Sequence, residues 1–173
     1  MKLLILGHGR HGKDTVAEYL SERHGLSFRS SSLFLAETVV RPALVEHGLV
    51  YDTLDACYED RVNHRCLWRD IILSYNADDL SRLARAVLGV SDCYVGMRSI
   101  EEYRASRRLF DVVVWVDAEA RGLPPDPSLT IGFEPDMILI DNNGSLAETY
   151  EQLDDWMRVL SWARPAATVS PTS

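Results

Sequence analysis

The stretch of sequence that decides the fold reads Leu3-Leu4-Ile5-Leu6-Gly7-His8-Gly9-Arg10-His11-Gly12-Lys13-Asp14-Thr15. Its first four residues form an uninterrupted apolar run, which is typical of a short strand buried in a parallel sheet. After Thr15 the apolar side chains recur at helical spacing, and Gly25 stands where a helix C-cap is expected. The stretch therefore predicts a strand, a glycine-rich loop and a helix in succession.

The glycine-rich loop fits the P-loop pattern G-x-x-x-x-G-K-[ST], except that Asp14 stands in the hydroxyl position. Glycines let the backbone curl so that successive amides point at phosphate oxygens, and the following helix directs the positive end of its dipole there. Lys13 can reach the β- and γ-phosphates of a nucleoside triphosphate. We therefore expect ATP as the cofactor. The residues expected to bind it are Gly7, Gly9, Arg10, His11, Gly12, Lys13, Asp14 and Thr15.

Asp14 is the departure from the pattern that bears on the metal. The usual hydroxyl at this position ligates Mg²⁺, and a carboxylate is also a hard oxygen ligand for that ion. We expect Asp14 to contact Mg²⁺ directly or through water, with Thr15 as the second candidate metal ligand and a contact for the α-phosphate. The alternatives for Asp14 are an outward-facing side chain and a group that orients the attacking hydroxyl. The alternative for the whole loop is a glycine-rich turn with a solvated lysine.

Strands and helices alternate along the rest of the chain, which indicates a parallel sheet with helices on both faces. Strands are expected near residues 2–6, 26–29, 92–96, 111–116 and 136–140. The stretch of about residues 32–90 is a mainly helical insertion after the second strand. We expect one α/β domain over residues 1–162, a three-layer sandwich, followed by a loose polar tail over residues 163–173.

Composition excludes several classes of protein. The chain has 173 residues and a formal net charge of −8, which argues against non-specific binding along duplex DNA but leaves room for a local basic patch. The three cysteines, Cys57, Cys66 and Cys93, form no C-x-x-C pair, so we expect reduced thiols rather than disulfides or a zinc site. No apolar run approaches about 18 residues, so we expect a cytoplasmic protein without a membrane partner.

The loop resembles the P-loop of bacteriophage deoxynucleoside monophosphate kinases, which carry G-K-D-T. Tyr94-Val95-Gly96-Met97-Arg98, followed by Glu101 or Glu102, is similar to the end of the third strand and the next helix in that group. Residues 136–144 resemble the last strand and the adenine-side loop of small P-loop kinases. The group includes phage kinases that phosphorylate 5-hydroxymethyluracil within DNA, and the serines at 30–32 and the segment Asp60–Arg65 resemble those proteins. The resemblance covers most of residues 1–160.

The resemblance implies a P-loop kinase that uses ATP and Mg²⁺ and phosphorylates a deoxynucleotide. The acceptor it favours is the hydroxymethyl group of 5-hydroxymethyluracil in phage DNA, presented as a single or flipped-out nucleotide, and the protein would then act in the cytoplasm of an infected host cell. The alternatives are a free deoxynucleoside monophosphate, a small metabolite, or a nucleotide-binding module that transfers nothing. The third strand ends without the usual Walker-B carboxylate, and Asp92 and Asp117 replace it only if strand geometry allows.

Phosphoryl transfer needs positive charge around the migrating group and a positioned nucleophile. Arg98 follows a strand end, where ligands of α/β sheets bind, so we expect it to contact phosphate. If residues 60–65 are helical, Arg61 and Arg65 share a face and could clamp a substrate phosphate. Asp60 is the first candidate for the base that orients the acceptor hydroxyl, and Glu37 is the second. The residues expected to bind the acceptor are Glu37, Arg41, Arg61, His64, Arg65 and Arg98.

Two readings stay open for the remaining polar residues. The charges of the helical insertion could instead form a solvated face with ion pairs between successive turns. Asn142 and Asn143 are expected to read adenine, but a turn that requires positive φ explains an Asn-Asn-Gly sequence equally well. The side chains of His8 and His11 are expected to point away from the phosphates, so that the backbone binds them.

Overall fold

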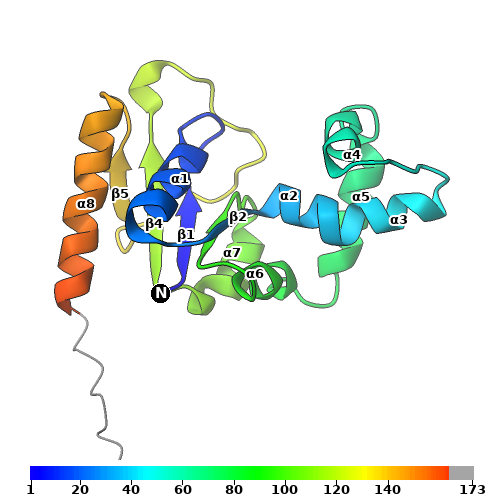
Figure 1. Ribbon diagram of the computed structural model, residues 1–173, viewed down its shortest axis with the longest axis horizontal. Coiled ribbons are helices and arrows are strands. Elements are labelled where there is room, and N and C mark those ends of the chain that lie inside the picture. Colours follow the sequence, from blue (N-terminus) through cyan, green and yellow to red (C-terminus); the bar gives the residue numbers. More distant parts are fainter. Residues whose placement is uncertain (164–173) are drawn as a thin grey trace, which may run out of the picture.

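Five strands form one parallel sheet in the computed structural model, which describes residues 1–163 (Figure 1). In chain order they are β1 (Leu3–Leu6), β2 (Phe28–Ser30), β3 (Cys93–Val95), β4 (Val112–Asp117) and β5 (Ile138–Asp141). The spatial order is β2-β3-β1-β4-β5, so β1 lies in the centre and pairs with β3 and β4. The predicted parallel sheet is confirmed, and each strand lies close to where its apolar run placed it.

Helices connect the strands and cover both faces of the sheet. They are α1 (Lys13–His24), α2 (Ser31–Leu35), the π-helical turn η1 (Ala36–Val40), α3 (Arg41–Glu46), α4 (Leu54–Asp60), α5 (Arg65–Asn76), α6 (Arg82–Leu88), α7 (Ile100–Ser106) and α8 (Leu146–Ala163). Two 3₁₀ turns, η2 (Arg107–Leu109) and η3 (Glu119–Arg121), flank β4. The three-layer α/β arrangement expected from the alternating pattern is therefore present.

The alternation of side chains along β1 divides the core in two. Leu3 and Ile5 pack with α1 and α8 on one face of the sheet. Leu4 and Leu6 pack with α2, α6 and α7 on the other face. All four side chains are fully buried. This burial on both faces explains why the strand reads as a continuous apolar run, and it fixes the position of the loop that follows.

The insertion after β2 forms a helical arm, which we define as η1 and α3 to α5 (Figure 1). The arm has its own small core, built around Ala36, Val40, Leu44, Cys57 and Trp68. In Figure 1 helices α3, α4 and α5 lie to one side of the sheet, and α2 joins them to β2. Pro42 lies in the first turn of α3, directly after the π-helical turn η1, where its missing amide cannot donate to the preceding turn. The predicted helical insertion after the second strand is thus confirmed.

The remaining global expectations meet the structure only in part. Of the predicted loose tail over residues 163–173, only Ala163 falls within the described residues, and it ends α8. Cys57 and Cys93 are buried, Cys66 is exposed, and all three are free thiols. Within residues 1–163 no helix is both long enough and apolar enough to cross a membrane.

Candidate active site

The backbone of the loop after β1 follows the curled path that the sequence predicts. Gly7 has φ +143°, and a Cβ placed there would lie 2.4 Å from the carbonyl oxygen of Val116. Arg10 has φ 66° and is the one non-glycine residue with positive φ among residues 1–163. Gly12 has φ 90° and is the N-cap of α1. The loop therefore turns tightly between β1 and α1, in conformations that favour glycine.

The N-terminus of α1 is open at this loop. Gly12 offers no side-chain cap, and α1 begins at the very next residue. The amides of Lys13, Asp14 and Thr15 belong to the first helical turn and have no intrahelical acceptor. Together with the helix dipole, such free amides form a site that attracts anions such as phosphate.

Lys13 lies within the loop with its ammonium group held by the loop itself. Its Nζ donates to the carbonyl oxygen of His8 at 2.6 Å. Burial lowers the pKa of Lys13 below its usual 10.5, the charge of Asp14 raises it, and the charge of Arg98 lowers it. The lysine is thus partly desolvated next to a second cation, and a phosphate oxygen can replace the His8 carbonyl as its acceptor.

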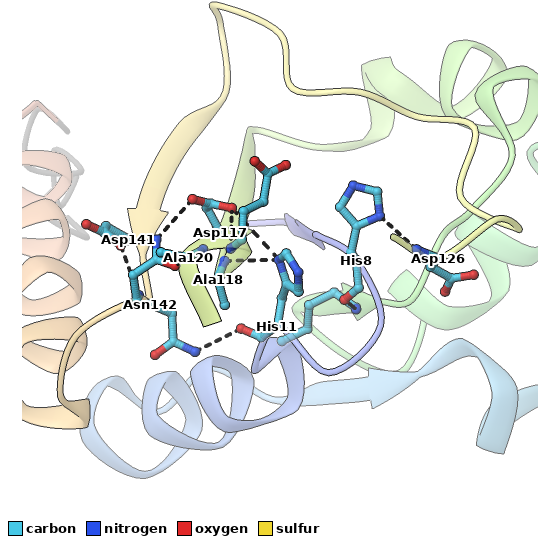
Figure 2. A network of polar contacts seen from close by, with 11 residues as sticks. His8, His11, Asp117, Ala118, Ala120, Asp126, Asp141 and Asn142 are labelled. Atoms are coloured by element: carbon cyan, nitrogen blue, oxygen red, sulfur yellow. Dashed lines mark hydrogen bonds and ion pairs between the residues drawn. The ribbon is translucent and has the colours of Figure 1, made fainter. Parts of the chain in front are cut away.

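Asp126 is a residue of this site that the sequence reading missed. It lies in the loop between β4 and β5, and its backbone N–H donates to Nδ1 of His8 at 3.2 Å (Figure 2). Its carboxylate forms an ion pair with Arg98 and lies 3.4 Å from where a Cβ of Gly9 would be. In the sequence it stands between prolines, which indicates a surface loop but not what the loop contacts.

Arg98 reaches the site from the end of β3, as predicted. Its guanidinium donates to Asp126 and to the hydroxyl of Ser128, and the backbone N–H of Thr130 donates to its carbonyl at 2.8 Å. The side chain is 54% exposed. The structure therefore brings Lys13 and Arg98 together. The β4–β5 loop contacts this site through Asp126, which bonds to His8 and to Arg98.

Oxygen donors suited to magnesium lie at the start of α1. Asp14 is exposed in the first helical turn, and Thr15 next to it is half-buried. Residues 1–163 contain no cluster of three or more metal-binding side chains. A magnesium ion held by one or two protein oxygens together with phosphate oxygens fits this donor set, because Mg²⁺ is commonly bound in that way.

The two candidates for the missing Walker-B carboxylate lie at opposite edges of the sheet. Asp92 precedes β3, and its carboxylate accepts hydrogen bonds from Ser27, so it is at the amino edge. Asp117 ends β4 at the carboxyl edge, with Oδ1 3.9 Å from Nδ1 of His11. Of the two, the structure places only Asp117 beside the loop.

His11 is buried and its ring points away from the loop interior to the end of β4, as expected (Figure 2). Its Nδ1 accepts a hydrogen bond from the backbone N–H of Ala118 at 3.0 Å. A ring nitrogen that accepts carries no proton, so the imidazole is neutral in the folded protein. Burial is the largest cause that lowers the pKa of His11 below its usual 6.5.

This lowered pKa predicts that the protein loses stability in mild acid. The unfolded chain binds a proton at His11 near pH 6.5, whereas the folded chain resists it, so the contribution to stability is complete above pH 6.5 and falls as pH decreases below that value. Urea unfolding between pH 7.5 and 5 measures the slope of the free energy of unfolding against pH. We expect His11→Gln to flatten it and the exposed-site variant His47→Gln to leave it unchanged. An equal slope in wild type and His11→Gln would contradict the assignment.

Asn142 and Asn143 connect protein segments. Asn142 is buried, and its Nδ2 donates to the carbonyl oxygen of His11 at 2.8 Å (Figure 2). Asn143 donates to the carboxylates of Asp141 and Asp117 and accepts from the amide of Ala120. Neither asparagine has positive φ, so the reading of a positive-φ turn is wrong.

Asp60 lies on the helical arm, at the end of α4, and not beside the loop (Figure 1). Its carboxylate accepts from the Tyr51 hydroxyl at 2.6 Å and from Asn63 at 2.6 Å, and it lies 3.1 Å from Nε2 of His64. These hydrogen bonds lower the pKa of Asp60 and, with burial, raise the pKa of Tyr51 to about 12. The structure thus gives Asp60 three protein partners on the arm.

The helix over residues 60–65 that a shared face of Arg61 and Arg65 requires is not formed. Helix α4 ends at Asp60 and α5 begins at Arg65, with a turn between them. The Arg61 guanidinium stacks over the Tyr58 ring at 3.6 Å, and Arg65 is exposed. The shared helical face that would make Arg61 and Arg65 a phosphate clamp is therefore not formed.

Glu37 and Arg41 are also engaged within the protein. Glu37 pairs with Arg29 at 3.1 Å, and both side chains are about half exposed. Arg41 donates to the carbonyl oxygens of Tyr51 at 2.9 Å and Asp52 at 3.2 Å, which fastens the loop before α4 to α3. Neither contact is an ion pair between successive helical turns, since Arg29 lies in β2 and Arg41 bonds to backbone carbonyls.

Comparison with known proteins adds evidence on the fold. No family model matches the sequence, and a search of curated proteins finds no match. The solved structure of TT1252 from Thermus thermophilus is similar, with a TM-score of 0.56, 18% identity, and coverage of 95% of this chain and 98% of that one.

Two kinase structures match more weakly. A gluconokinase from Sinorhizobium meliloti 1021 has a TM-score of 0.49 and 15% identity, with 95% of this chain and 97% of that chain covered. A sugar kinase from Janibacter sp. HTCC2649 has a TM-score of 0.48 and 19% identity, with 95% and 98% covered. With its five-stranded parallel sheet, the chain shares the α/β fold of the TT1252 structure.

Proposed function

We propose that the protein is a kinase that transfers the γ-phosphate of ATP, with Mg²⁺, to a deoxynucleotide. The observation that carries the proposal is the curled loop over residues 7–15, which ends in the open N-terminus of α1 with Lys13 half-buried beside it. An uncapped helix N-terminus, a loop that favours glycine and a desolvated lysine together suit the binding of a triphosphate.

The charged groups around the loop have separate roles in this proposal. The free amides of the first turn of α1 bind phosphate oxygens, and Lys13 exchanges the His8 carbonyl for a phosphate. Arg98 exchanges Asp126 for the migrating phosphoryl group, where its charge stabilises the transition state. Asp14 and Thr15 would hold Mg²⁺, which neutralises phosphate charge when bound.

For the acceptor we favour the hydroxymethyl group of 5-hydroxymethyluracil in DNA. The support is the resemblance of the serine-rich and Asp60–Arg65 segments to phage kinases of that type. Ser30 ends β2, and Ser31 and Ser32 begin α2, so all three lie at the edge where α/β sheets bind ligands. The Ser32 hydroxyl bonds to that of Tyr58 at 2.9 Å, which connects this edge with the arm.

Asp60 and Glu37 stay our candidates for the group that orients the acceptor hydroxyl. Both belong to the arm, so this role requires the arm to approach the loop when substrates bind. Arg41, Arg61, His64 and Arg65 would line the acceptor side after such a movement, and Asn143 the nucleotide side.

The test is a transfer assay with γ-labelled ATP. The acceptors are 5-hydroxymethyluracil DNA, the same DNA with thymine, and each free deoxynucleoside monophosphate. We expect label on the hydroxymethyluracil DNA alone. Label on a free monophosphate would replace this acceptor with the free nucleotide, and tight ATP binding without any labelled acceptor would favour the non-transferring module, which the missing carboxylate at the end of β3 suggests.

A further inference from the structure

We propose that Asn142 is a positioning residue that holds the phosphate loop in its binding conformation through the His11 carbonyl. The inference rests on the proposed triphosphate site, and it names the residue that supports the loop of that site. It differs from adenine recognition, the role that its place in the sequence suggested.

The side chain of Asn142 is only 2% exposed, and both ends of its amide have protein partners. Nδ2 donates to the His11 carbonyl at 2.8 Å, and Oδ1 accepts from the Thr149 hydroxyl at 2.8 Å and from Arg121 at 3.3 Å. A carbonyl oxygen can only accept, so the nitrogen of the amide must face His11. Asn142 therefore has one defined orientation, and its burial together with these partners keeps it from the surface where a base would bind.

The bond to the His11 carbonyl controls the direction of an amide in the loop. The carbonyl of His11 and the N–H of Gly12 belong to one trans peptide plane and point in opposite directions. Holding the carbonyl toward Asn142 therefore directs the Gly12 N–H away from Asn142. No protein group among residues 1–163 accepts from that N–H, so it is available to a ligand.

Close packing reinforces this arrangement. Gly12 has φ +90°, and a Cβ there would lie 2.4 Å from Nδ2 of Asn142, so the asparagine fills the space that a side chain would need. On its other side, His11 is held through its ring by the Ala118 amide at 3.0 Å. The residue before Gly12 is thus fixed from the ends of both β4 and β5, as Figure 2 shows.

The decisive experiment compares ATP with inorganic tripolyphosphate, using calorimetry on the full chain. Asn142→Asp keeps the shape but puts a carboxylate oxygen against the His11 carbonyl. We expect the affinity for ATP and for tripolyphosphate to fall by the same factor, about tenfold or more, because the defect lies in the loop. If Asn142 reads adenine, ATP affinity falls while tripolyphosphate affinity stays at the wild-type value, and the inference is overturned.

Acidification supplies a readout that a general loss of structure would not give. Protonation of the introduced carboxyl group restores an O–H donor to the His11 carbonyl. The ratio of variant to wild-type affinity for tripolyphosphate should therefore rise toward one as pH falls from 7 to 5. A ratio that does not change with pH contradicts the proposal.

Two further variants complete the test. Thr149→Val removes the hydroxyl donor to Oδ1 but keeps the bond to His11, so tripolyphosphate affinity should change by less than about threefold. If Asn142→Asp does not fold, Asn142→Ser is measured with the same two ligands and must show the same equal loss. A wild-type protein that binds neither ligand refutes the proposed function itself, whereas normal binding by a folded Asn142 variant refutes only this inference.

Discussion

Replacing Lys13 by alanine is expected to slow phosphoryl transfer by about 10²–10³-fold, the usual effect of removing one donor that stabilises transition-state charge. The lysine is the first residue of α1, it is half-buried, and its present acceptor is a loop carbonyl that a phosphate can replace. Because the site is partly desolvated, its charge acts more strongly than a surface lysine would. Single-turnover transfer from labelled ATP measures the effect.

Lys2 provides a matched control for the loss of a lysine. It is the only other lysine in the chain, and its Nζ donates to the carbonyls of Leu88 and Ser91 at the amino edge of the sheet. Lys2→Ala should reduce stability but keep the transfer rate of the folded protein. Lys13→Arg should recover only part of the activity, since the planar guanidinium group of arginine does not reproduce the compact ammonium group of lysine. Wild-type transfer by Lys13→Ala would remove Lys13 from the mechanism.

The strands and the loop were predictable because their signals are local. A strand buried on both faces must be apolar at every position, as Leu3 to Leu6 are, and the loop is recognised from glycines that its positive φ values favour. The insertion was predictable for a similar reason, since helical periodicity over residues 32–90 contains no strand signal. Each of these features depends on residues adjacent in the sequence.

Asp126 and the contacts of Asn142 could not be predicted in this way. The sequence places Asp126 in a proline-rich loop, but its contact with His8 depends on where β4 and β5 end in space. Asn142 lies at the end of a strand, where ligand binding and structural support give the same sequence pattern. Only the tertiary packing, which brings its amide to His11, distinguishes the two roles.

The turn that separates Arg61 from Arg65 has a local cause. The segment between α4 and α5 contains neither glycine nor proline, so nothing in its composition indicates a break. The turn is formed by local polar contacts: the Asn63 side chain donates to Asp60 at 2.6 Å, and its backbone N–H donates to the Asp60 carbonyl at 2.9 Å. Side chains of this kind compete with helical hydrogen bonds, and here they end the helix.

Gly7→Ala is expected to lower the free energy of unfolding by roughly 3 kcal/mol or more, through backbone strain together with overpacking. Gly7 has φ +143°, and the new Cβ would lie 2.4 Å from the carbonyl oxygen of Val116. That oxygen belongs to the backbone of β4, which is held in the sheet by its pairing with β1 and β5, so it cannot move aside as a flexible side chain would. For a chain of this size the loss corresponds to a melting temperature about 10 °C lower.

Gly25→Ala separates the clash at Gly7 from the cost of positive φ. Gly25 has φ +69°, and no other group lies within 4 Å of its Cβ position, so only about 1–2 kcal/mol should be lost.

Thermal unfolding with and without ATP and Mg²⁺ then connects the fold with the site, because a ligand that binds only the folded state raises the melting temperature. Gly25→Ala should keep that increase and Gly7→Ala should lose most of it, since the strained residue begins the phosphate loop. Equal increases in both variants would mean that ATP binds away from the loop.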